Sequence, residues 1–273
     1  MAITKADVSG GIRELNLSHA PLCVHSSLRS FGFVQGGALA IVQGIPEEGC
    51  TLMVPSFTSL GVPPPPGRTL QHNGSRESYL SDLNRRAHAT PTFDATSALI
   101  DPDMGRIPKC VVSRTGRKRG NHPLNSFSAV GALADELIQG QQPLDVYAPL
   151  RTLAELNGFV ILMGVDLTSL TLIHFAECLA GRNAFRRWAR GESGRVIECE
   201  AGGCSDGFEK LAPFVADLAR AISVGSSTWT VLPARPTVHR LSGVIRENPM
   251  VTHCGNDHCD RCNDAVLGGP ILA

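Results

Sequence analysis

The sequence predicts an α/β protein with a mixed, largely parallel central sheet and helices on both faces. A glycine-opened, helix-like apolar pattern, Gly36–Ile45, lies between two β-rich runs, Leu22–Leu28 and Gly49–Phe57. Strand, helix and strand in this order are typical of a parallel βαβ unit. The run Phe159–Val165 is apolar throughout, as expected for a strand that is covered on both faces. A helical pattern follows it, which repeats the strand-to-helix step. All 273 residues are expected to form one domain.

The remaining elements follow in chain order. The first twenty residues are expected to be helical, and a proline-rich insertion near 58–106 is expected to be irregular, because proline fixes φ and lacks a backbone donor. A loop of this length is typical of a lid or a binding segment. We further expect a strand at Cys110–Arg114, helices at Ser128–Gly140 and Pro149–Leu156, and a strand, turn and helix after Gly194.

Composition excludes several classes of protein. The 25 basic and 25 acidic side chains give a formal net charge of zero, which argues against nucleic acid as a partner. No apolar run approaches the roughly 20 residues that cross a bilayer, and the N-terminus lacks the apolar region of a secretory signal. A cytoplasmic protein without membrane contact is therefore expected. Its nine cysteines would then be reduced thiols or metal ligands.

His174 and Glu177 follow the strand of Phe159–Val165 after one turn. Active sites of open α/β sheets form at the carboxyl ends of strands, and positions i and i+3 share one face of a helix. A carboxylate beside an imidazole suits a general base. On spacing alone, an amphipathic helix with an exposed glutamate is the simpler interpretation.

A second polar segment precedes the predicted helix Ser128–Gly140. His122-Pro123 by itself indicates only a turn, and Ser126 is placed to cap that helix. The basic residues just before this segment could hold phosphates or form a solvated loop, and the residues alone favour neither; they are Arg114, Arg117, Lys118 and Arg119.

Together these segments resemble the aminoglycoside 3-N-acetyltransferase family of antibiotic N-acetyltransferases. The resemblance covers Leu22 to Ala180 with order and spacing intact, and extends weakly into "GGCSDGFEKLAP". It is carried by "VHSSLRSFGFVQGGALAIVQGI", "GCTLMVPSF", "TPTFDATSALIDPDMGRIP", "NHPLNSFSAVG", "YAPLRTLAELNGFVILMGV" and "TSLTLIHFAE". It implies an antibiotic N-acetyltransferase-like fold.

The resemblance also implies an activity. Members of this family transfer acetyl from acetyl-coenzyme A to the 3-amino group of aminoglycoside antibiotics in a direct ternary complex, and so confer resistance. His174 would be the general base and Glu177 the residue that orients it. A tetrahedral intermediate needs preorganised donors for its oxyanion; Thr171, with Thr168 and Ser169, is a candidate. Helix capping is the alternative role of these hydroxyls.

The resemblance assigns binding residues as well. The stretch that would line the pantetheine arm of the cofactor is His25, Ser26, Ser27 and Leu28, and the cofactor-side loop would supply Ser126 and Phe127. Candidates for the cofactor phosphates are Arg29, Arg117, Lys118 and Arg119. A polycationic substrate needs carboxylates around it, and the candidates in family-like motifs are Asp94, Asp145 and Asp166.

The cysteine-rich segment 251–265 departs from this resemblance. Short spacings make Cys254, Cys259 and Cys262 candidates for a structural zinc site. His258 or His253 could supply the fourth ligand. Cys199 and Cys204, which precede the tail, are further candidates to complete the site. A reduced tail without metal is the alternative.

Two other functions remain open at this point. The chain could be an acetyltransferase for another small amine, or a metal-binding relative without turnover. The intact His174 and Glu177 pair argues against the second of these, and the tail cysteines argue for it.

Overall fold

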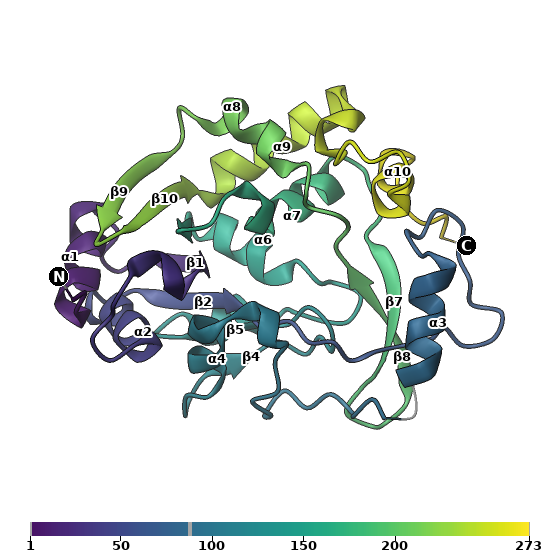
Figure 1. Cartoon of the computed structure of the whole chain (residues 1–273), viewed down its shortest axis with the longest axis horizontal. Helices are drawn as coiled ribbons and strands as arrows, with labels where there is room; N and C mark the ends of the chain where they lie inside the picture. The colour runs from purple at the N-terminus through teal and green to yellow at the C-terminus, as the bar shows by residue number, and fades with distance from the viewer. Residues whose placement is uncertain (1, 87–88, 273) are drawn as a thin grey trace.

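The computed structural model describes residues 2–86 and 89–272, and these residues form two β-sheets with helices around them (Figure 1). The larger sheet has seven strands. In spatial order they are β4 (Lys118–Arg119), β5 (Phe127–Val130), β2 (Thr51–Pro55), β1 (Pro21–Ser26), β6 (Phe159–Met163), β10 (Ser227–Pro233) and β9 (Arg220–Val224). β1 runs parallel to β2 and β6, whereas the outer pairings are antiparallel. The predicted mixed α/β architecture is confirmed, with parallel pairing at its centre.

Helices cover both faces of the large sheet. The α-helices are α1 (Lys5–Glu14), α2 (Ala38–Glu47), α3 (Glu77–Arg86), α4 (Arg106–Val112), α5 (Ala134–Ile138), α6 (Ala148–Glu155), α7 (Leu172–Leu179), α8 (Ala212–Val215), α9 (Ala234–Glu247) and α10 (Asp260–Val266). Single 3-10 turns are η1 (Leu28–Phe31), η2 (Pro102–Met104), η3 (Leu167–Ser169), η4 (Phe208–Leu211) and η5 (Pro249–Thr252). None of the helices within the described residues is both apolar and long enough to span a membrane.

The core consists of two layers, one on each side of the large sheet. On β1, Leu22 and Val24 pack with α1, α2 and α4, whereas Cys23 packs with α5, α6, α7 and α9. Adjacent residues of a strand point to opposite faces, so a strand covered on both sides is apolar at every position. This explains the continuous apolar run of β6, which alternates in the same way.

Two predicted elements are wrong. The sequence predicts a strand at Cys110–Arg114, but α4 ends at Val112, and Ile107, Pro108, Val111 and Val112 are buried at helical spacing. The single helix expected over Ser128–Gly140 is instead the end of β5 followed by the short α5. Phe127–Val130 pairs antiparallel with β2. The buried backbone groups of β2 require hydrogen-bond partners, and a helix over these residues could not supply them.

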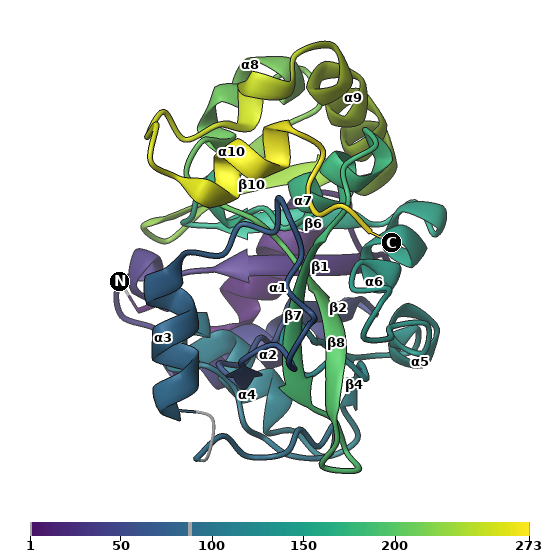
Figure 2. The ribbon, with the colours of Figure 1, turned by 90° about the vertical axis from the view of Figure 1, so that its right-hand side faces the viewer.

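The second sheet is small and lies at the opposite end of the molecule from the N-terminus (Figure 1). It contains β3 (Gly61–Val62), β7 (Phe185–Arg190) and β8 (Val196–Ala201), in that order. Figure 2 shows β7 and β8 crossing the edge of the large sheet. The proline-rich insertion supplies β3, α3 and η2, so this segment is more ordered than the sequence indicates.

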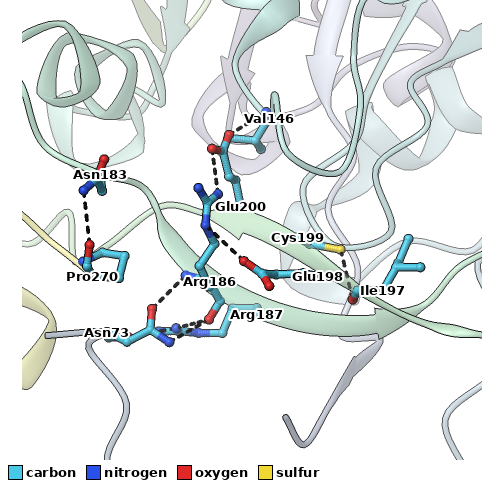
Figure 3. Close-up of polar contacts among 10 residues, drawn as sticks. All are labelled: Asn73, Val146, Asn183, Arg186, Arg187, Ile197, Glu198, Cys199, Glu200 and Pro270. Atoms are coloured by element: carbon cyan, nitrogen blue, oxygen red, sulfur yellow. Dashed lines mark hydrogen bonds and ion pairs between the residues drawn. The ribbon is translucent and has the colours of Figure 1, made fainter. Parts of the chain in front are cut away.

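Polar contacts fix the small sheet to its surroundings (Figure 3). Arg186 of β7 forms ion pairs with Glu198 and Glu200 of β8, at 3.3 and 2.7 Å. Glu200 also accepts a hydrogen bond from the Val146 N–H group. The Asn73 side chain bonds both backbone groups of Arg186. The insertion, the small sheet and the loop before α6 are thus held together beside the large sheet.

Candidate active site

A cavity of about 1120 Å³ opens at the carboxyl ends of β1 and β6, between the two sheets. One wall comes from the end of β1 and η1, and another from η3 and the start of α7. The turn after β8 and the insertion complete it, with Gly202 and Tyr79 among their lining residues. This is the edge of an α/β sheet at which ligands bind. The cavity is therefore the candidate active site.

His174 lines this cavity and is held by a buried carboxylate. Its Nδ1 lies 2.8 Å from Oε2 of Glu177, one turn further along α7. The other oxygen of Glu177 accepts a hydrogen bond from Arg182. Arg182 is itself buried and also donates to Thr252 Oγ1 and to the carbonyl of Pro249. Sequence reasoning found the first two residues of this chain of contacts and missed Arg182.

The contacts of Glu177 determine the tautomer of His174. A carboxylate that is paired with a buried guanidinium is ionised and can only accept hydrogen bonds. Nδ1 of His174 must then be the donor, which leaves the lone pair of the neutral ring on Nε2. Nε2 lies beside Gly202 of the cavity wall, since a Cβ atom at Gly202 would be 3.0 Å from it. Chemically, this tautomer can accept a proton through Nε2.

Aromatic rings and a glycine fix the position of the imidazole. Tyr147 stacks on His174 with centroids 6.4 Å apart and planes at 17°, and Phe208 meets it edge-on at 4.8 Å. A side chain at Gly202 would collide with His174 and with the Tyr147 hydroxyl. Burial raises the pKa of Tyr147 well above its ordinary value, so this residue remains a neutral phenol.

The end of β1 presents polar groups to the same cavity, and all five residues from His25 to Arg29 line it. Burial lowers the pKa of His25 to about 4, so its ring is neutral near pH 7. The Ser26 hydroxyl is buried and has no hydrogen-bond partner among the described residues. A buried hydroxyl without a partner is unfavourable, so turning this side chain toward a ligand in the cavity would break no hydrogen bond. Arg29 is exposed at the cavity mouth.

The hydroxyls expected to stabilise an oxyanion differ in their contacts. Thr168, Ser169 and Thr171 all line the cavity. Thr168 donates to Asp166, which caps η3. Thr171 is largely buried at the start of α7, and its side chain makes no cap hydrogen bond. Among the described contacts, the hydroxyls of Thr171 and Ser169 are thus the two of this group without a hydrogen bond to the fold.

The family model described as aminoglycoside 3-N-acetyltransferase matches residues 23–245, which include the whole His174–Glu177–Arg182 chain of contacts. The chain belongs to the aminoglycoside 3-N-acetyltransferase family. It is therefore an acyltransferase. Aminoglycoside N(3)-acetyltransferase III of Salmonella sp is 30% identical over 241 residues, covering 80% of this chain and 82% of that relative.

Solved structures of family members share the fold. A variant of aminoglycoside acetyltransferase AAC(3)-IVa in complex with a gentamicin superposes with a TM-score of 0.77 at 22% identity, over 98% of both chains. AAC-IIIb in binary complex with CoASH superposes with a TM-score of 0.71 at 20% identity, over 90% of this chain and 97% of that one.

Several residues that the resemblance assigned to the acetyltransferase cofactor lie outside the cavity. Ser126 is buried against Ser56, and Phe127 is a core residue of β5. Asn125, their neighbour, does line the cavity. Buried His122 arranges this loop, because its Nδ1 accepts the N–H groups of Leu124 and Asn125 at 3.3 and 2.8 Å.

The basic run serves the fold rather than the cavity. Arg117 donates to the carbonyls of residues 95–97, and Arg119 is buried, bonds Ser126 and lies over the ring of Phe93. Lys118 pairs with Asp135 on the surface. Among the described residues that line the cavity, the exposed cations are Arg29, Arg106 and Arg261, and sequence reasoning missed the last two.

The three aspartates expected to bind substrate also lie outside the cavity lining. Asp94 accepts from Thr96, Asp145 pairs with Arg151, and Asp166 accepts from Thr168. Among the described side chains that line the cavity, the only carboxylate is that of Asp103. The substrate-binding role of these aspartates is predicted from family-like motifs. In turns, however, short polar side chains commonly bond nearby backbone groups instead.

The tail cysteines are also outside the cavity, next to its β8 wall. The structure brings Cys254, Cys259 and Cys262 together with Cys204. Cys199 lies apart from this group, in the small sheet. His258 is exposed, and His253 bonds the Asn263 side chain through Nε2. The fourth sulfur thus comes from the turn after β8, about fifty residues before the tail.

Proposed function

We propose that this acyltransferase transfers the acetyl group of acetyl-coenzyme A to the 3-amino group of an aminoglycoside. The observation that carries the proposal is the contact of Glu177, itself paired with Arg182, with Nδ1 of His174. This contact leaves Nε2 as the proton acceptor at the wall of a cavity large enough for two reactants. Two members of the family support the choice of ligands: AAC-IIIb is known with CoASH, and AAC(3)-IVa with a gentamicin.

The chemistry follows from the nucleophile. An aminoglycoside amine near neutral pH is mostly an ammonium ion, which has no lone pair with which to attack a thioester. His174 takes one proton from the amine, and the nitrogen lone pair attacks the carbonyl carbon to form the N–C bond. The C–S bond then breaks, the proton on His174 passes to the departing thiolate of coenzyme A, and the nitrogen releases its second proton to solvent.

The oxyanion formed in this step needs donors that are in place beforehand. The Thr171 hydroxyl is suited to this role because it caps no backbone group. At the other side of the cavity, the free hydroxyl of Ser26 can bond an amide or carbonyl of the cofactor. Arg29 and Arg106 are suited to the cofactor phosphates at the exposed mouth.

The charge of the cavity favours a second candidate, an acetyltransferase for another small amine. A polycation bound away from water requires carboxylates. The described lining residues include one carboxylate, Asp103, and four arginines, namely Arg29, Arg106, Arg187 and Arg261. An acceptor that carries one amine and an anionic group would suit these charges.

A panel assay distinguishes the two candidates. Release of coenzyme A thiol is measured with acetyl-coenzyme A and either aminoglycosides, such as gentamicin, or simple and phosphorylated amines. We expect turnover with aminoglycosides, with the product acetylated at the 3-amino group by NMR. Turnover confined to the other amines would select the second candidate, and thiol release with neither group would contradict both.

A further inference from the structure

Four cysteines from three separate segments meet beside the β8 wall of the cavity. Their Sγ atoms all lie within 4.8 Å of one another. Cys204 comes from the turn after β8, Cys254 follows η5, and Cys259 and Cys262 are at the first turn of α10. We call these four residues the cysteine cluster. Three of them are buried and the fourth is half-buried.

We propose that the cysteine cluster binds one structural zinc ion through all four sulfurs. A tetrahedral Zn²⁺ site has Zn–S bonds of about 2.3 Å, which separate the sulfurs by roughly 3.8 Å, and a spread of at most 4.8 Å fits this size. Four sulfurs without a carboxylate or imidazole among them favour zinc over magnesium or calcium. Four protein ligands also leave no open position, as is typical of a structural site.

Backbone N–H groups and a turn orient the sulfur atoms of the cluster. The N–H group of Cys254 points to Sγ of Cys262, with a distance of 3.4 Å. The N–H of Cys259 closes a turn on the carbonyl of Asn256, and this turn brings Cys259 back to Cys254. Such N–H···S contacts and tight turns orient metal-binding sulfurs.

The metal would connect three parts of the cavity wall. Gly202, Gly203 and Ser205, which flank Cys204 in the chain, line the cavity, and so does Arg261 between Cys259 and Cys262. α10 in turn holds the insertion, since Asp264 accepts the N–H of Gly74 at 2.6 Å and Asp260 pairs with Arg76 at 2.8 Å. Without the ion, no metal bond would join the tail to Cys204, in the turn that carries Gly202, the neighbour of His174.

Metal analysis of the full-length protein tests the proposal. We expect about one zinc per chain after purification without chelator. Cys204→Ser and Cys262→Ser should lose most of this zinc, whereas Cys199→Ser and Cys110→Ser, outside the cluster, should keep it. Cys204 and Cys199 are the informative pair, because both precede the tail and only the first is in the cluster. Equal zinc in these two variants, or wild-type protein without bound metal, would overturn the proposal.

A second measurement does not depend on the folding of a variant. Wild-type protein loaded with Co²⁺ in place of zinc should show the intense visible and thiolate charge-transfer absorption of a tetrahedral four-sulfur site. After denaturation in chelator, all nine cysteines should react as thiols. A count lower by two or four would mean that the cluster forms disulfides instead and would overturn the proposal. Acetyl transfer by metal-free protein would leave the proposed activity intact, so the two proposals fail separately.

Discussion

The carboxylate of Glu177 divides its two oxygens between His174 and Arg182. Glu177 and Arg182 are each less than a tenth exposed, and a buried carboxylate requires a cation beside it. We therefore propose Arg182 as a positioning residue, because it holds the second oxygen of Glu177. Glu177 in turn keeps the proton of the neutral imidazole on Nδ1.

Glu177→Gln should lower kcat by roughly 10²–10⁴-fold, the range for loss of a general base or of its correct tautomer. The glutamine amide can donate to Nδ1, which would move the ring proton to Nε2 and remove the acceptor from the cavity. The measurement is kcat at saturating concentrations of both substrates, with circular dichroism to verify folding.

The matched control for this change is Glu198→Gln. Glu198 also pairs with an arginine, Arg186, but on β8 and outside the cavity lining (Figure 3). We expect nearly wild-type turnover in the control. Equal kcat values for the two variants would remove Glu177 from the mechanism.

At the scale of elements, the end of β1 pairs with β6 and also contributes His25 and Ser26 to the cavity lining. Ser26→Ala should raise the KM for acetyl-coenzyme A roughly 2- to 10-fold, the equivalent of one hydrogen bond. The unfolding temperature of the free protein should stay the same or rise, because the hydroxyl has no partner there.

Ser242→Ala is the comparison for Ser26→Ala. Ser242 is a buried serine on α9 that donates to the carbonyl of His239, so its loss should lower stability and leave the KM unchanged. A structural role of Ser26 would produce this second pattern instead, and the cofactor assignment would then fail.

Two kinds of pattern are predicted correctly from the sequence. The strands β1, β2 and β6 are apolar because both faces of the sheet are covered, and the helices α6 and α7 show helical spacing, which in α7 places His174 and Glu177 one turn apart. α4 resembles a strand in the sequence because its valines have high β propensity, while its burial follows helical spacing.

The rest of the site depends on contacts between distant segments. Arg182 is held by Thr252 and Pro249 of η5, and Gly202 lies against His174 from the turn after β8; no local pattern marks either residue. The aspartates Asp94, Asp145 and Asp166 are the opposite case: their motifs are visible in the sequence, but their carboxylates are used by neighbouring groups.

At the scale of the whole molecule, buried histidines link stability to pH. Burial lowers the pKa of His25 and of His122 to about 4, whereas an unfolded histidine titrates near 6.5. Between these values the unfolded chain binds more protons, so stability is present above about pH 6.5 and is lost as the pH falls toward 4. Each residue contributes up to about 1.4 kcal/mol per pH unit.

Urea unfolding between pH 7 and pH 4.5 measures this dependence. His122→Asn should flatten it, since an asparagine oxygen can accept the same backbone N–H groups without titrating in this range. His239→Asn, on the exposed surface of α9, serves as the control. An unchanged pH dependence in the His122 variant would contradict the assignment of a neutral buried imidazole.

The central claim is that His174 removes a proton from an amine in the cavity between the two sheets. The most direct test is kcat of His174→Ala with acetyl-coenzyme A and an accepted amine, beside Cys178→Ala from the same helix. The account predicts a loss of roughly 10²–10⁴-fold in the first variant, partial recovery with added imidazole, and little change in the second. A kcat of His174→Ala close to that of the unaltered protein would contradict it.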